Sequence, residues 1–165
     1  MNFTPAPTPE TERERLAVLR GLGALDTEGG PRFQEIVDTA AHVFGAPMAF
    51  VSLVDADRLW FFARHGVETR EERRDVSFCA HAILHPEPLV LLNAGIDRRV
   101  SSNPLVQSEP YVRFYAGAPV MVQGHAMGTL CILDFEPRFR FSERETETLK
   151  FLAGVAAERL AERSG

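Results

Sequence analysis

Two long apolar segments in the second half of the chain constrain its fold most strongly. Residues 113–122 and 126–134 are apolar with isolated polar groups, and a three-residue polar turn separates them. This pattern predicts two paired β-strands with at least one buried face. Arg113 and Tyr115 open the first strand and Cys131 lies in the second. The same sheet wall could therefore also line a pocket.

Composition narrows the class of protein. The chain has 165 residues, a usual size for one domain, and 45% of them are hydrophobic, enough for a core without disulfides. A net charge of -5 argues against a nucleic-acid surface. No apolar run is long enough to span a bilayer, and residues 1–14 do not resemble a signal peptide. We expect a cytoplasmic protein with a flexible leader at residues 1–9 and one domain at residues 10–165.

Helix and strand signals surround the apolar pair. Three-and-four spacing over residues 31–44 indicates an amphipathic helix. Ser142 and Glu145 form a capping box for the last helix, and Thr8 with Pro9 is a favourable start for the first. The predicted helices are residues 10–22, 31–44, 77–84 and 142–162, and the further predicted strands are residues 48–54, 58–64 and 88–92.

Two segments lack a regular pattern. Residues 65–76 interleave glutamate and arginine, which predicts a solvated loop whose ion pairs contribute little. Residues 93–107 form a long polar crossing, and loops of that length within a domain are often functional. The order of the elements predicts an α+β sandwich: two helices, a hairpin, the crossing with its short helix, a second hairpin and a closing helix.

Short segments along nearly the whole chain, from about residue 12 to residue 160, resemble the GAF domain family in its bacterial sensory form. Taken singly these motifs are weak, and it is their order that is specific. They are residues 22–27 (LGALDT), 51–55 (VSLVD), 58–61 (RLWF), 77–83 (SFCAHAI), 103–106 (NPLV), 113–119 (RFYAGAP) and 128–134 (GTLCILD).

The resemblance implies a GAF/PAS-like fold with a central antiparallel sheet of five or six strands. The first, second and last helices would cover one face. The short helix and the crossing would cap the other face and enclose a small-molecule pocket. The candidate ligand-binding residues are Trp60 or Phe62, Phe78, Cys79, His81, Arg113, Tyr115 and Thr129.

The same residues allow a ligand hypothesis and an alternative. Arg113 and the amides at the start of the short helix would suit an anion or a carboxylate. Alternatively Trp60 and Phe62 belong to the core, and Arg113 pairs with Asp97 to hold the crossing. The sequence identifies no cofactor. The lysine motif of cyclic-nucleotide-binding members is missing, because Lys150 is the only lysine, and the cysteine-histidine pair of bilin-binding members is interrupted.

Catalytic and metal sites have weak support. Cys79 and His81 would point to different faces of a helix, so a zinc site is a poor fit to the spacing. Cys79, at a helix start, is the better candidate for a reactive thiol, whereas Cys131 resembles a core residue. A chain of this size with only two cysteines is typical of a cytosolic protein whose thiols are reduced. The sequence leaves open whether the two cysteines form a disulfide. Ser77 is better explained as a helix cap than as a nucleophile.

We therefore predict a non-enzymatic sensory domain that binds a small ligand and signals through its terminal helices. The seam formed by Leu16, Leu19 and Leu22 predicts an interaction face and a homodimer. The resemblance implies a histidine kinase or diguanylate cyclase as output, with the chain either a stand-alone regulator or part of a longer protein. Two alternatives stay open, a thiol-dependent reductase of the methionine sulfoxide type and a dimerisation module without a ligand.

Overall fold

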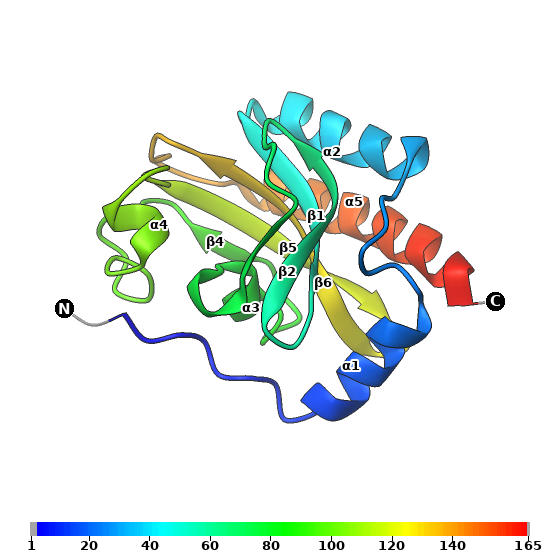
Figure 1. Cartoon of the computed structure of the whole chain (residues 1–165). Helices are drawn as coiled ribbons and strands as arrows, with labels where there is room; N and C mark the ends of the chain where they lie inside the picture. The colour runs from blue at the N-terminus through cyan, green and yellow to red at the C-terminus, as the bar shows by residue number, and fades with distance from the viewer. Residues whose placement is uncertain (1–2, 165) are drawn as a thin grey trace.

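The computed structural model describes residues 3–164, which form a six-stranded antiparallel sheet with helices on both faces (Figure 1). The strand order is β3-β2-β1-β6-β5-β4, so β1 and β6 lie at the centre. This arrangement confirms the predicted α+β architecture. The strands are β1 (Met48–Val54), β2 (Arg58–His65), β3 (Glu71–Arg73), β4 (Leu89–Leu91), β5 (Phe114–Val122) and β6 (His125–Asp134), and the helices are α1 (Glu12–Gly21), α2 (Pro31–Phe44), α3 (Cys79–Ala82), α4 (Pro104–Gln107) and α5 (Glu143–Ala161).

The predicted apolar pair is the β5–β6 hairpin. Its turn consists of Gln123 and Gly124, which both have positive φ, 52° and 77°. Such turns suit the right-handed twist of the flanking strands. All but one of the β5 residues are buried, because helices cover one face of the sheet and the crossing covers the other.

One face of the sheet packs against α2 and α5. Phe33 on α2 meets Phe62 on β2 edge to face, with ring centroids 4.7 Å apart. Helix α5 begins with the predicted capping box, in which Ser142 and Glu145 each accept a backbone hydrogen bond from the other residue. The face that α5 turns to the sheet is fully buried, and it consists of Leu149, Ala153, Ala156 and Leu160.

Helix α1 differs from its prediction in two respects. It begins at Glu12 after Thr11, so Thr8 is not its cap. Its apolar seam is part of this domain's own core, because Leu19 is 0% and Leu22 3% exposed. The prediction of an interaction face at this seam is therefore wrong. Residues 3–9 of the predicted leader contain neither helix nor strand, and residues 1–2 lie outside the described part.

The sequence pattern did not predict two short elements, the edge strand β3 and the helix α4. Within residues 65–76, β3 pairs with β2 and continues into a 3₁₀ turn, Arg74–Val76. Within the crossing, α4 is capped by Asn103, whose side chain accepts a hydrogen bond from the Leu105 amide. No helix within residues 3–164 is both long enough and apolar enough to cross a membrane.

Candidate functional site

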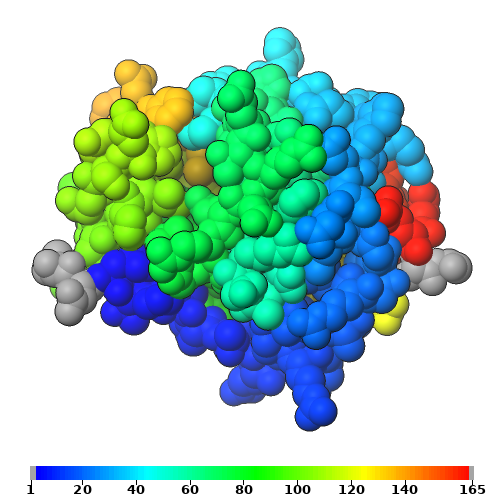
Figure 2. All heavy atoms as spheres, viewed as in Figure 1, coloured from blue at the N-terminus to red at the C-terminus, as the bar shows by residue number. Residues whose placement is uncertain are grey.

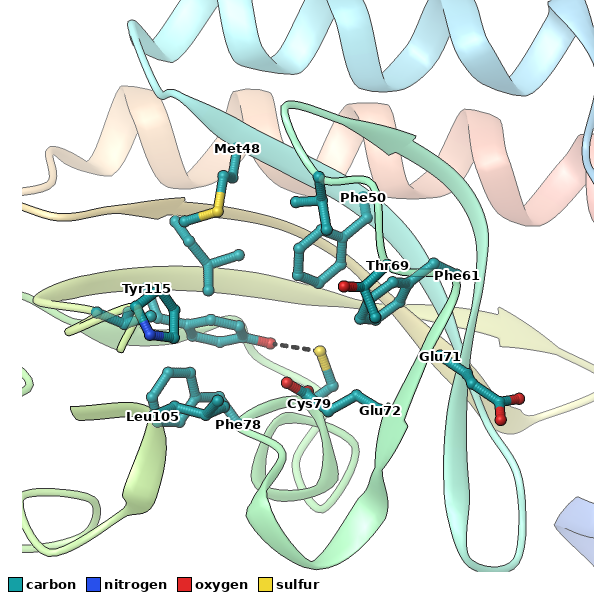
Figure 3. A pocket seen from close by; sticks show the side chains of 14 residues that line it. Met48, Phe50, Phe61, Thr69, Glu71, Glu72, Phe78, Cys79, Leu105 and Tyr115 are labelled. Carbon is teal, nitrogen blue, oxygen red and sulfur yellow. Dashed lines mark hydrogen bonds between the residues drawn. The ribbon is translucent and has the colours of Figure 1, made fainter. Parts of the chain in front are cut away.

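A cavity of about 260 Å³ lies between the sheet and its cap. Figure 2 shows the crossing, in yellow-green, and the segment after β2, in green, on the face of the molecule that is turned to the viewer. These two segments belong to the cap that covers the cavity. Figure 3 shows Met48 and Phe50 from β1 on one side of the cavity, with Phe78 and Leu105 on the other. The exposed residues Thr69 and Pro110 also border it, so the cavity opens between the segment before β3 and the end of the crossing.

Aromatic rings form much of the cavity wall. The rings of Phe50 and Phe61 are stacked, with centroids 4.5 Å apart. On the other side Phe78 meets Tyr115 edge to face at 5.4 Å. Such pairs favour one ring arrangement over others, so the wall is shaped before a ligand arrives.

A buried polar group of the wall is the Cys79 thiol, at the start of α3. Its sulfur accepts a hydrogen bond from the Tyr115 hydroxyl at 3.3 Å (Figure 3) and another from the Thr129 hydroxyl at 3.1 Å. The Thr129 oxygen in turn lies 3.1 Å from that of Ser52. Since Thr129 uses its proton on the sulfur, Ser52 donates to Thr129. A chain of hydroxyls from β1 and β6 thus ends on this thiol.

Two acidic residues of β3, Glu71 and Glu72, line the cavity, and Glu71 pairs with Arg58 whereas Glu72 does not. The Glu72 carboxyl has no hydrogen-bond or ion-pair partner within residues 3–164, and burial raises its pKa to about 8, with a further contribution from negative charge on Cys79. The Cys79 thiol has the opposite shift. Burial opposes ionisation, but the polar side chains around the sulfur, those of Cys131, Ser52, Thr129 and Tyr115, outweigh it and lower its pKa. Near neutral pH the cavity therefore holds a protonated carboxyl beside an ionisable thiol.

This assignment predicts how stability depends on pH. The folded protein holds the Glu72 proton up to a pKa of about 8, whereas the unfolded chain loses it near 4.5. The folded state thus binds more protons between these values, so the free energy of unfolding falls as pH rises through this window. Replacing Glu72 by glutamine should remove this fall in the free energy of unfolding. At pH ~8 the variant should therefore be more stable than the parent by on the order of 2 kcal/mol.

Urea unfolding of the parent and variant at both ends of the window measures this difference. Glu68→Gln is the matched control, because Glu68 is exposed and three residues before β3. Equal pH dependence in the parent and the Glu72 variant would show that this carboxyl ionises normally.

The structure brings three of the candidate residues to the cavity. Phe78, Cys79 and Tyr115 line it. Thr129 is not a lining residue; it lies behind the wall, where its hydroxyl donates to the Cys79 sulfur. Ser77 is not the residue directly before α3, but its hydroxyl accepts a hydrogen bond from the Ala80 amide, as a capping serine does.

Trp60 and Phe62 belong to the other face of the sheet, so the prediction that one of them faces the pocket is wrong. The Trp60 indole donates a hydrogen bond to the Thr27 carbonyl at 2.6 Å. The residue between them, Phe61, lines the cavity instead. Successive side chains of a strand point to opposite faces, and the sequence could not indicate which face was which.

Arg113 and His81 also lie outside the cavity wall. The Arg113 guanidinium donates to the carbonyls of Val106 and Val112, at 2.9 and 3.1 Å. It therefore holds the crossing, as the alternative prediction stated, but not through Asp97, which pairs with Arg99. The half-buried His81 leaves its Nε2 atom without a hydrogen-bond partner in the described chain, and burial lowers its pKa. No group of three or more potential metal ligands occurs within residues 3–164.

Comparison with known proteins assigns this architecture. The GAF domain family model matches residues 30–160.

The chain belongs to the GAF domain family. A cyclic di-GMP phosphodiesterase of Pseudomonas aeruginosa is 39% identical to it over 155 residues, which cover 93% of this chain and 26% of that protein. This GAF domain thus spans about a quarter of the length of that relative.

Two solved structures show the same fold at low identity. The GAF domain of a phosphoenolpyruvate-protein phosphotransferase from Coxiella burnetii has a TM-score of 0.66 and 17% identity, covering 91% of this chain and 92% of that one. A type II free methionine-R-sulfoxide reductase from Thermoplasma acidophilum has a TM-score of 0.62 and 14% identity, covering 79% and 93%. At these identities the likeness concerns the fold alone.

Proposed function

We propose that this GAF domain is a sensory module that binds a small ligand in the cavity between the sheet and α3. The observation that carries the proposal is a cavity of about 260 Å³ with an aromatic wall and an unpaired carboxyl, Glu72. Ligand sites are commonly apolar clefts with a few polar groups that fix orientation. A partly buried carboxyl with a raised pKa in such a cleft is a marker of a functional site.

The charge of the wall favours a neutral or cationic ligand over the anion expected from sequence. No basic side chain is among the described residues that line the cavity, whereas Glu71 and Glu72 are acidic. Arg113, on which the anion hypothesis rested, donates to backbone carbonyls outside it. A protonated Glu72 can donate a hydrogen bond to a neutral ligand, and the ionised form can pair with an amine.

Ligand occupancy would reach the terminal helices through the sheet. Strand β6 carries Thr129 on the cavity side, while its backbone carbonyl at Ala126 accepts a hydrogen bond from Arg15 of α1. A ligand shifts such a system only if it binds one arrangement better than another. The P. aeruginosa relative supports an output module of cyclic di-GMP metabolism. We keep the homodimer as a proposal, now through α5, where Phe151 is 70% exposed.

Filling the cavity tests the binding proposal. Leu105 lies on α4, lines the cavity and is partly exposed, so Leu105→Trp should fill the cavity without disrupting the core. We expect a panel of small neutral and cationic aromatic compounds to raise the melting temperature of the parent and to leave this variant unchanged.

Leu152→Trp is the matched control, because Leu152 is also partly exposed but packs on the helix-covered face. It should respond to the panel as the parent does. A compound that stabilises the parent and the Leu105 variant equally would place binding elsewhere and contradict the proposal.

A further inference from the structure

A second cysteine lies directly behind the cavity wall. The sulfur atoms of Cys79 and Cys131 are 3.9 Å apart, and both residues are buried, at 2% and 0% exposure. Cys79 comes from α3 in the cap and Cys131 from β6 in the centre of the sheet. Only the first of them lines the cavity. We propose that Cys79 and Cys131 form a redox-active pair, in which a hydroperoxide that enters the cavity oxidises Cys79 and the two residues then join as a disulfide.

The surroundings of the pair differ from those of ordinary buried thiols. Hydrogen bonds from Tyr115 and Thr129 converge on the Cys79 sulfur, and the Cys79 thiol in turn donates to the Cys131 sulfur. Donors stabilise a thiolate, which is the nucleophilic form of cysteine. The Cys131 thiol instead contacts the Phe50 carbonyl at 3.7 Å, and burial with the negative charge of Cys79 raises its pKa well above the ordinary value. The two cysteines are therefore chemically unequal.

The position of the tyrosine depends on a glycine. A β-carbon on Gly117 would lie 2.2 Å from the Tyr115 hydroxyl oxygen and 2.6 Å from its Cζ. Only a residue without a side chain thus leaves room for this hydroxyl on the sheet surface, where it reaches Cys79. Closing the space would move the hydroxyl away from the sulfur.

The chemistry balances with a hydroperoxide as oxidant. The Cys79 thiolate attacks the outer oxygen of the peroxide, the O–O bond breaks, and the sulfur becomes a sulfenic acid. The departing alkoxide takes a proton, which the protonated Glu72 carboxyl in the same cavity can supply, and leaves as an alcohol. The Cys131 sulfur then attacks the sulfenic sulfur, a disulfide forms, and water carries away the hydroxyl group and the thiol proton. An external dithiol reverses the change.

Closing the bond requires little movement. A disulfide has a sulfur–sulfur distance of about 2.05 Å, so the sulfur atoms must approach by roughly 2 Å. Bond formation would tie α3 to β6 and remove the acceptor that Tyr115 and Thr129 use in the reduced protein. The oxidised domain would therefore have a changed cavity wall. The formation of this disulfide does not depend on which ligand the cavity binds.

Mass spectrometry after treatment with hydrogen peroxide tests the pair. We expect the parent to lose two hydrogen atoms, to yield a linked Cys79–Cys131 peptide without reduction, to remain monomeric in mass and to be restored by dithiothreitol. In Cys131→Ser, Cys79 should accumulate as a sulfenic acid that dimedone labels. In Cys79→Ser, Cys131 should stay reduced under the same treatment.

Two milder variants keep the test informative if a cysteine variant unfolds. Tyr115→Phe and Thr129→Val each remove one hydrogen-bond donor to the Cys79 sulfur. Each variant should form the Cys79–Cys131 disulfide roughly tenfold more slowly than the parent. Circular dichroism verifies that every variant is folded. Two free thiols in the treated parent, a disulfide between two chains, or an unchanged oxidation rate in both donor variants would overturn the proposal.

Discussion

Glu12→Gln is expected to destabilise the domain by about 3–5 kcal/mol. The Glu12 carboxylate accepts hydrogen bonds from Arg15 at 2.8 and 3.1 Å, and it also pairs with Arg74. These arginines are 1% and 7% exposed, so the carboxylate is the counterion of two buried cations. A neutral amide would leave both charges uncompensated, which costs far more than losing an exposed ion pair.

The pairing also predicts an acid sensitivity. Burial opposes ionisation of Glu12, but its hydrogen bonds to Arg15 and Arg74 and their charges outweigh it and lower its pKa below 4.5. Its contribution to stability is therefore complete above 4.5 and is lost as pH falls through the folded value.

Urea unfolding of the parent, Glu12→Gln and Glu14→Gln measures this effect. Glu14 lies in the same first turn of α1 but is exposed, so its replacement removes the same helix-end charge without touching a buried arginine. The control should change stability by less than about 1 kcal/mol. Equal losses in the two variants would mean that the buried network contributes nothing beyond the helix terminus.

Gly128→Ala is expected to prevent folding. A β-carbon at Gly128 would lie 1.7 Å from the Ser52 carbonyl oxygen and 2.9 Å from the Leu53 Cα, both backbone atoms of β1. The two strands are the centre of the sheet, so neither can move away without breaking the pairing. Overpacking of a buried site is one of the few causes of a loss in unfolding free energy above about 4 kcal/mol.

Gly154→Ala is the control for this substitution. Gly154 lies on the exposed side of α5, and a β-carbon there meets no atom within 4 Å. Alanine should stabilise that helix by about 0.5–1 kcal/mol. Circular dichroism and thermal unfolding of the purified variants decide the matter, and a folded Gly128 variant with near-parent stability would contradict the close approach of β1 and β6.

The sequence predicted elements whose local pattern agrees with their tertiary role. Helix α2 carries a single apolar face, α5 has a capping box, and the β5–β6 hairpin combines apolar strands with a polar turn. Short elements held by the rest of the fold gave no such signal. Strand β3 has three charged residues and forms through its backbone pairing with β2.

The site was harder to predict for the same reason. Glu72 belongs to β3, in a segment whose alternating charges resemble a solvated loop. Strand β2 is apolar on both faces, so its alternation could not show that Phe61 faces the cavity and Phe62 the helices. Cys79 and Tyr115 line the cavity as expected, because the family resemblance implied the positions of α3 and β5 relative to the sheet, and their role in binding stays a prediction.

Methionine methyl resonances offer the most direct test of ligand binding in this cavity. Met48 lines it, Met127 lies in the core on the opposite face, and Met121 is 44% exposed. In protein labelled with ¹³C at the methionine methyl groups, titration with a compound that raises the melting temperature should shift the Met48 resonance and leave Met127 unchanged. A shift of Met127 or Met121 with Met48 unaffected would contradict binding between the sheet and α3.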